Sequence, residues 1–151
     1  MFENRIPPPI VAAFFGLVMW ASSLVLPALE VSDQLRIIVS ISVLLLGVIF
    51  CAAGVLSFRL AKTTVNPLQP DKASSLVDSG IYRITRNPMY LGFSLFLLAW
   101  SVFLSSPLLI LGMVAFVLFM NRFQIKPEER ALTKIFGEEF EGYQARVSRW
   151  L

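Results

Sequence analysis

Three long apolar runs dominate the pattern of hydrophobic and polar positions along the chain. Residues 10–29 and 37–58 carry no charge, and each is long enough for a helix crossing about 30 Å of hydrocarbon. Residues 89–120 are also uncharged but too many for one comfortable crossing. Ser105, Ser106 and Pro107 near the middle form a turn signal. The pattern therefore predicts four spans, at about 10–29, 37–58, 88–104 and 107–123, with the third and fourth forming a hairpin.

The positions of the basic residues predict an orientation for these spans. Four crossings place twelve of the thirteen lysines and arginines on the side of both termini, and only Arg36 on the other side. Lysine and arginine concentrate on the cytoplasmic side of membrane proteins. We therefore expect both termini, the loop 59–87 and the tail 126–151 to be cytoplasmic, in what we expect to be a bacterial inner membrane.

Composition supports a single all-α integral membrane domain covering residues 1–151. The chain is 56% hydrophobic and 15% charged, which is too apolar for an ordinary soluble domain. Its net charge of +3 comes from residues that flank apolar runs, so no nucleic-acid partner is expected. The single cysteine, Cys51, lies inside an apolar run and the sequence has no histidine, so no metal site is expected. Gly47 and Gly54 share one face of the second span and permit close helix packing, either within the chain or between chains.

The stretch GIYRITRNPMYLG, residues 80–92, is more elaborate than a membrane connector requires. Pro88 fits the first turn of the third span, and Asn87 before it fits the N-cap, where its side chain would accept from backbone amides. Anchoring of a helix end at the membrane interface would also account for Arg83, Arg86 and Tyr90.

The tail predicts a cytoplasmic amphipathic helix. Pro127 suits a first helical position, and apolar residues recur at steps of three and four to form a stripe, which Gly137 interrupts. The members of this stripe are Leu132, Ile135, Phe136, Phe140, Tyr143, Val147 and Trp150. The stripe would lie on the membrane surface or pack on the cytoplasmic loop.

Two acidic residues at the start of this tail have two explanations. Glu128 and Glu129 suit the first turn of a helix, where carboxylates favour the helix dipole. However, Asn121 and Arg122 end the fourth span close by, and Arg86 is expected at the same depth. Charged groups gathered at a membrane border are functional candidates.

Residues 80–92, followed by PEERALTKIFGEEFEGY, resemble the isoprenylcysteine carboxyl methyltransferase family, which belongs with the membrane phospholipid methyltransferases. The family pattern is G-x-Y-x-x-x-R-H-P-x-Y-x-G, then E-E-x-x-L-x-x-x-F-G-x-x-Y-x-x-Y. Its first block is matched by Gly80, Tyr82, Arg86, Pro88, Tyr90 and Gly92, and its second by Glu128, Glu129, Leu132, Phe136, Gly137 and Tyr143. Phe140 replaces the first tyrosine of the second block. Asn87 replaces the usual histidine, as in phosphatidylethanolamine methyltransferases.

The resemblance implies methyl transfer from S-adenosylmethionine, bound from the cytosol between the third span, the fourth span and the C-terminal helix. Glu128 and Glu129 would lie near the sulfonium and ammonium of this donor. Arg86, and with it Arg149, would bind its carboxylate through a guanidinium fork. Arg86, Glu128 and Glu129 are thus the candidate catalytic residues, and either glutamate would be the base for an ammonium acceptor.

The same resemblance implies further contacts with the donor. Asn87 and Tyr90 would supply a polar edge and a flat wall for the adenine, and Gly92 would allow a helix or the donor to approach closely. Tyr82 and Pro88 complete the candidate cofactor-binding set because they occupy matched motif positions.

The methyl acceptor implied by the resemblance is lipophilic and reaches the site sideways from the bilayer, among the membrane lipids. It could be a lipid amine, an isoprenylcysteine-like carboxylate, a small thiol or another hydrophobic molecule. Two other functions fit the same residues less closely. One is a membrane reductase related to sterol reductases that uses NADPH, and the other is a non-catalytic membrane scaffold or binding protein.

Overall fold

The computed structural model describes residues 6–61 and 75–151, and every regular element in those two ranges is a helix. Part of the predicted loop 59–87 lies outside the described residues. The elements are α1 (Pro8–Ser23), α2 (Asp33–Leu60), η2 (Gly80–Arg83), α3 (Pro88–Phe103), η3 (Pro107–Leu109), α4 (Ile110–Met120), η4 (Asn121–Ile125), α5 (Lys126–Phe136) and α6 (Glu138–Arg146).

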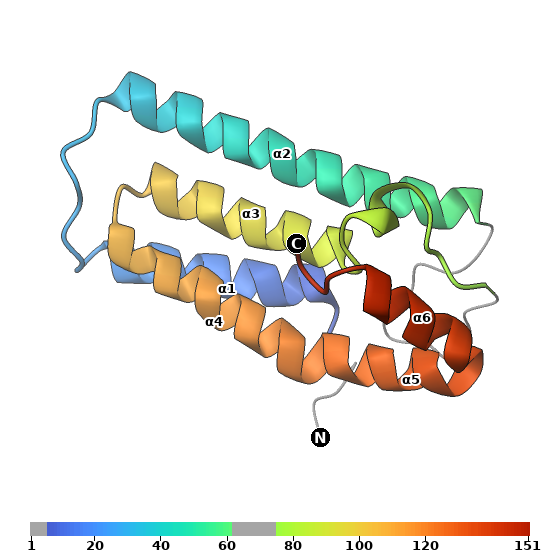
Figure 1. The fold of residues 1–151 in the computed structure, drawn as a ribbon. Coiled ribbons are helices and arrows are strands. Elements are labelled where there is room, and N and C mark those ends of the chain that lie inside the picture. Colours follow the sequence, from blue (N-terminus) through green and yellow to red (C-terminus); the bar gives the residue numbers. More distant parts are fainter. Residues whose placement is uncertain (1–5, 62–74) are drawn as a thin grey trace.

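The long helices form a bundle around α3. Helix α3 packs against α2 on one side and against α1 and α4 on the other (Figure 1). Helices α5 and α6 lie at the end of the bundle where α2 ends and α3 begins, while the α1–α2 and α3–α4 connections meet at the opposite end (Figure 1). There the Leu29 amide donates to the Ser105 carbonyl, and the Ser106 hydroxyl donates to the Pro27 carbonyl.

Within the part of the chain that the structure describes, two continuous helices are long and apolar enough to cross a membrane. They are Asp33–Leu60 and the run Pro107–Phe136. Helices α1 and α3 are apolar but have 16 residues each, about 24 Å of helix. Helix α1 ends at Ser23 rather than at the predicted residue 29. The residues after Ser23 instead make hydrogen bonds to the α3–α4 turn. In this turn Ser105 has a φ of +56° and Pro107 begins η3.

Glycines bring α2 and α3 unusually close together. A Cβ at Gly92 would clash with the Cys51 sulfur and lie 2.8 Å from the Gly47 carbonyl oxygen. A Cβ at Gly47 would meet the Phe96 ring at 2.7 Å, and one at Gly54 would meet Met89 at 2.8 Å. All three positions are therefore filled by contacts within the chain, which is one of the two packing modes that the sequence permits.

The Gly92→Ala variant is therefore expected to destabilise the bundle. The added methyl group overlaps backbone as well as a side chain, and overpacking of this kind costs roughly 1–3 kcal/mol. Thermal unfolding in detergent measures the effect. Gly142→Ala is the matched control, because a Cβ there meets nothing within 4 Å and alanine favours a helix. Equal melting temperatures for the two variants would contradict the close packing of α2 and α3.

The fourth apolar helix does not end before the tail. It continues through a π-helical turn, Asn121–Ile125, directly into α5, so Pro127 lies inside a continuous helix rather than at the start of a separate one. A proline ring crowds the carbonyl four residues earlier, here that of Phe123, which lies in the π-helical turn. Single π turns of this type often occur at functional sites.

The predicted tail helix is broken into α5 and α6 at Gly137, which has a φ of +51°. Its apolar stripe packs mainly on the segment before α3. Phe140, Tyr143 and Val147 form a buried cluster with Val77 and Tyr82, against which Leu132 and Phe136 pack. Trp150 packs instead against the cluster between the bundle helices, and Ile135 remains 40% exposed.

Candidate functional site

A cluster of polar side chains lies where the start of α3, the start of α5 and the C-terminal segment 147–150 meet. Its centre is Glu129. The Arg149 guanidinium donates to both oxygens of this carboxylate, at 3.0 Å from Nε and 2.6 Å from Nη2. Arg86 Nη1 lies 2.9 Å from Glu129 Oε1. The side chains of Arg86 and Glu129 are only 12% and 15% exposed, so this ion pair is largely removed from water.

Arg86 keeps donor groups without a hydrogen-bond acceptor. Its Nε and Nη1 atoms are both buried, and neither makes a hydrogen bond within the described chain. The 2.9 Å contact of Nη1 with Glu129 is thus an ion pair whose geometry does not form a hydrogen bond. Because buried donors are normally satisfied, these two N–H groups suit an acceptor from a bound molecule.

Glu128 is paired with Tyr90 rather than with the arginines around Glu129. The Tyr90 hydroxyl donates to Glu128 Oε1. Glu128 belongs to α5, beyond the span 107–123 that the sequence predicts, and its carboxyl group is largely surrounded by protein atoms. This burial raises the pKa of Glu128 to about 8; the Tyr90 hydrogen bond lowers the pKa, and the nearby Glu129 charge raises it.

The C-terminal segment crosses the loop before α3 and is held to it by backbone and side-chain hydrogen bonds. The Arg86 amide donates to the Ser148 carbonyl at 3.0 Å, and the Asn87 side-chain amide donates to the Arg149 carbonyl at 2.9 Å. Trp150 Nε1 donates to Asn121 Oδ1 at 3.1 Å, which ties the segment to the π-helical turn. These contacts fix Arg149 over Glu129.

Asn87 therefore differs from its predicted role as a capping side chain. It is the N-cap residue of α3 by position, but its side chain makes no capping hydrogen bond. The amide is engaged by the Arg149 carbonyl instead, and the Asn87 backbone amide donates to the Thr85 hydroxyl at 3.2 Å. Pro88 is at the start of α3, as predicted, and is fully buried.

Two other predicted site residues make no hydrogen bond to these groups within the described chain, although Tyr82 lies close enough to Glu128 and Tyr90 for their charges to interact. Gly92 faces Cys51 and Gly47 of α2, so its missing side chain serves helix packing. The Tyr82 ring packs edge-on against Phe58, and its carbonyl accepts from the Tyr143 hydroxyl at 2.8 Å. Burial raises the pKa of both tyrosines, so the two phenols stay neutral. The structure thus brings together Arg86, Asn87, Tyr90, Glu128, Glu129 and Arg149.

Gln124 is a further polar residue of the site that sequence patterns do not single out. It lies in the π-helical turn, is fully buried, and donates from Nε2 to the Ile6 carbonyl at 2.7 Å. This bond fixes the amide orientation, because the reversed amide would place two oxygens together. Oε1 is left buried without a donor in the described chain. Gln124 precedes Glu128 by four residues on the same continuous helix.

Comparison with known proteins gives the family of this chain. A model of the family described as "Phospholipid methyltransferase" matches residues 35–139. An uncharacterised protein of Haemophilus influenzae is 46% identical over 63 residues, which are 42% of this chain and all of that protein. A probable protein-S-isoprenylcysteine O-methyltransferase of Oryza sativa is 30% identical over 112 residues, 72% of this chain and 57% of the rice protein.

An Arabidopsis thaliana protein-S-isoprenylcysteine O-methyltransferase is 27% identical over 110 residues, 71% of this chain. The chain spans a little over half the length of these plant relatives, 57% and 54%. The family match runs from the start of α2 to the start of α6, and so includes the first block of motif residues and the second block as far as Gly137, with Arg86, Glu128 and Glu129 of the cluster. On this match, the chain belongs to the phospholipid methyltransferase family.

Proposed function

We propose that the protein is a membrane methyltransferase that uses S-adenosylmethionine and transfers the methyl group to a lipophilic acceptor. The observation that carries this proposal is the largely buried cluster in which Glu129 pairs with arginines from two other parts of the chain, next to Glu128, and in which Arg86 has two buried donors without an acceptor among the described residues. A helix that is only anchored at the membrane border does not require buried, paired charges of this kind.

The residues fit the charges of S-adenosylmethionine. The Arg86 donors suit its carboxylate, because guanidinium groups bind carboxylates through paired, charge-assisted hydrogen bonds. Glu128 and Glu129 suit its sulfonium and ammonium groups. When bound, this donor supplies an electrophilic methyl group. The chain's own part is to hold the donor and orient the acceptor, which is the main source of catalysis in a direct displacement.

Glu128 also suits proton transfer. A lipid ammonium must lose a proton before it can be methylated, and a general base works best when its pKa lies near the working pH. Burial moves the pKa of the Glu128 carboxyl into that range, and Tyr90 holds the group in place. A carboxylate or thiolate acceptor would need no base, and Glu128 would then serve donor binding alone.

The proposal is tested with the purified protein, deuteromethyl-labelled S-adenosylmethionine and a bacterial membrane lipid extract. Mass spectrometry should detect a lipid that has gained the labelled methyl group, and calorimetry should detect donor binding. Parallel titration with NADPH examines the reductase alternative. Binding of NADPH without binding of S-adenosylmethionine would replace the proposal with a reductase, and binding of neither ligand would favour the scaffold.

We also propose that all four apolar helices cross the bacterial inner membrane and that the cluster around Glu129 faces the cytoplasm. The support is the twelve-to-one distribution of basic residues together with the position of α5 and α6 at one end of the bundle.

Single-cysteine variants are expected to report this orientation. In a Cys51→Ala background, Glu30→Cys should react with a membrane-impermeant maleimide added to intact cells, because Glu30 lies in the exposed α1–α2 connection. Ala145→Cys, on exposed α6, should react only after the cells are lysed. Labelling of position 145 from outside would reverse the proposed orientation and remove the cytosolic donor site.

Donor affinity is expected to rise with pH between about pH 6 and pH 8. The Glu128 carboxyl has a pKa of about 8, so it holds a proton over much of this interval, and a bound cation would drive that proton off. Binding then releases a proton and strengthens as the pH rises. Glu128→Gln cannot ionise and should show a flatter profile, with only the donor's own titration remaining. If donor affinity depends on pH in the same way in wild type and in Glu128→Gln, then Glu128 does not interact with the bound donor.

A further inference from the structure

The continuous helix Pro107–Phe136, which contains α4 and α5, carries all of its basic residues in one row (Figure 1). They recur at every fourth position, and each of them is exposed. The members of this basic row are Arg122, Lys126, Arg130 and Lys134. Residues four apart on a helix lie on the same side of it, so the row forms one cationic ridge.

The basic row continues an apolar row that is exposed at the surface of the bundle. Ile110, Val114 and Leu118 precede Arg122 at the same spacing, and these three residues are 43%, 42% and 62% exposed. Exposed apolar side chains on a helix long enough to cross a membrane are suited to contact with lipid chains. The row changes from apolar to basic between Leu118 and Arg122, which is about one helical turn.

The opposite side of the same helix changes its character at the same level. Phe116 and Met120 are fully buried in the bundle, and Gln124, the next residue at this spacing, is fully buried but polar. Both sides of the helix therefore place the membrane border just before Arg122. Orientation in a membrane requires basic residues on one side of the bilayer, but it does not require them to form one exposed row.

The acidic residues of this helix do not offset the charge of the basic row. Glu128 and Glu129 are the only two between residues 107 and 136, and Glu129 pairs with Arg86 and Arg149. Burial raises the pKa of Glu128 to about 8, so this carboxyl group is mostly protonated at neutral pH. The helix therefore presents an excess of positive charge on its exposed side.

The spacing of the basic row matches the depth of a lipid head-group layer, which is roughly 5–8 Å thick on each side of the hydrocarbon. Lys126 lies about 6 Å beyond Arg122 along the helix, so both residues fall within such a layer. Arg130 and Lys134 lie farther out. Their long side chains lean towards the start of the helix, which is the membrane end, and so remain near the charged surface.

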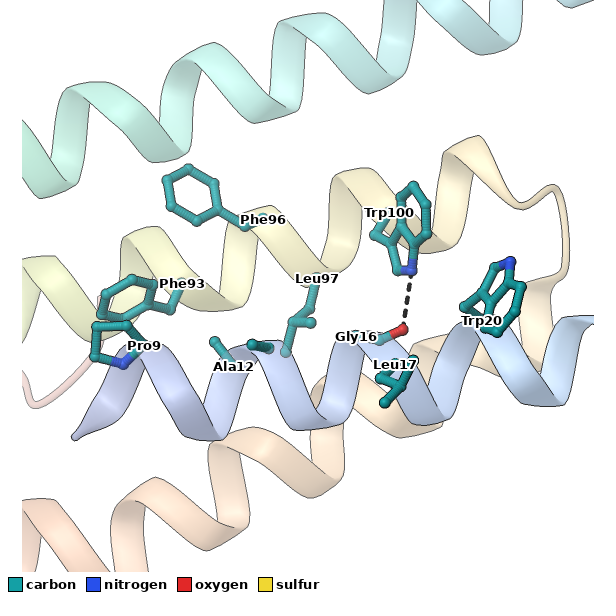
Figure 2. Close-up of a pocket in the computed structure, with 10 residues that line it drawn as sticks. Pro9, Ala12, Gly16, Leu17, Trp20, Phe93, Phe96, Leu97 and Trp100 are labelled. Carbon is teal, nitrogen blue, oxygen red and sulfur yellow. Dashed lines mark hydrogen bonds between the residues drawn. The ribbon is translucent and has the colours of Figure 1, made fainter. Parts of the chain in front are cut away.

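We propose that the basic row binds the phosphate groups of anionic phospholipids in the adjacent leaflet, with phosphatidylglycerol as the representative lipid. Charge complementarity selects this partner, and so does position, because the row begins where the exposed apolar row ends. The inference requires α4 to cross the membrane, as proposed above, but it does not require methyl transfer. The row is also separate from the apolar groove between α1 and α3, whose lining residues all come from those two helices (Figure 2).

Quenching by lipids that carry a nitroxide on one acyl chain tests the proposal. The reporter is an uncharged fluorophore attached to the full chain with Cys51→Ala and Leu118→Cys, because Leu118 is the exposed residue one turn before Arg122. The protein is reconstituted into phosphatidylcholine vesicles that contain the nitroxide on either phosphatidylglycerol or phosphatidylcholine. Lipids of either charge reach apolar surfaces of the bundle, so only the difference between the two quenching curves reports on the basic row.

The labelled protein should be quenched more strongly by phosphatidylglycerol than by phosphatidylcholine. This preference should shrink when salt rises from about 0.1 M to about 1 M, because the Debye length falls from about 10 Å to about 3 Å. Lys126→Gln should lower the preference about fivefold, the contribution of one basic residue near an anionic surface. Arg122→Gln combined with Lys126→Gln should remove most of the preference, whereas Lys126→Arg keeps the charge and should keep the preference.

Arg146→Gln is the matched control, because Arg146 is 70% exposed on α6, outside the row, and its replacement removes the same charge as Lys126→Gln. It should leave the preference unchanged. Equal quenching by the two lipids with the row intact would overturn the proposal and leave the row to a soluble acidic partner. A preference that survives in Lys126→Gln and in the double variant, or that Arg146→Gln lowers as much as Lys126→Gln does, would also overturn it. These measurements use no S-adenosylmethionine, so their outcome is separate from that of the proposed methyl transfer.

Discussion

The Glu129→Gln variant is expected to lose both stability and donor affinity. Glu129 neutralises Arg86 and Arg149 in a setting where Arg86 is only 12% exposed. Removing one partner of a buried ion pair leaves an uncompensated charge, which costs about 3–5 kcal/mol. We expect about 3 kcal/mol, the lower end of that range, because the Arg149 side chain is 34% exposed and water screens part of its charge. Unfolding in detergent monitored by circular dichroism measures this effect.

Donor affinity should fall in the same variant for a second reason. Loss of a charge-assisted contact costs roughly 1.5–3 kcal/mol, about tenfold to a hundredfold in affinity. Calorimetric titration well below the melting temperature of the variant measures this loss separately from stability. Glu139→Gln is the control, because Glu139 is exposed on α6 and its replacement should change stability by less than about 0.5 kcal/mol. If Glu129→Gln is less stable but binds the donor with wild-type affinity, then Glu129 only holds the two arginines in place and does not contact the donor.

Several features of the fold could be predicted because they follow from local rules. The turn at Ser105–Pro107 is required by an apolar run too long for one helix, and the break at Gly137 follows from the ease with which glycine adopts a positive φ. The start of α3 at Pro88 follows from the missing amide of proline, which costs nothing in a first turn. The gathering of Arg86, Glu128 and Glu129 agrees with their position next to the ends of the predicted third and fourth spans.

Other features depend on contacts between distant segments, which local patterns do not specify. A proline next to a helical pattern usually marks the start of a helix. At Pro127, however, the π-helical turn before it allows the helix to continue from α4 into α5. The Asn87 side chain donates to the Arg149 carbonyl and makes no capping hydrogen bond to α3. Gln124 looks like an ordinary polar residue near a membrane border until the Ile6 carbonyl fixes its amide. A glutamine just beyond the last apolar run, four residues before a candidate glutamate, is the signal that could have identified it.

The Arg86→Met variant is expected to discriminate between two forms of the donor. Arg86 Nε and Nη1 are buried without hydrogen-bond acceptors among residues 6–61 and 75–151, and the carboxylate of S-adenosylmethionine would satisfy them. Removing one partner of a buried, hydrogen-bonded charge pair costs roughly 2–5 kcal/mol of binding. The decarboxylated analogue of S-adenosylmethionine lacks the carboxylate, so the variant should bind it almost as well as wild type does. Calorimetric titration of both proteins with both ligands gives the four affinities required.

The comparison of ligands removes the indirect effects of the substitution. Loss of Arg86 also removes one of the two ion pairs of Glu129 and leaves the pair with Arg149. This change affects the binding of both ligands to the same extent. The difference between the two ligand losses therefore isolates the interaction with the carboxylate. Arg83→Met is the control, because Arg83 is exposed in the same loop and should change neither affinity. Equal losses for both ligands in Arg86→Met, with selective loss in Arg149→Met, would assign the carboxylate to Arg149 and leave Arg86 as the partner that orients Glu129.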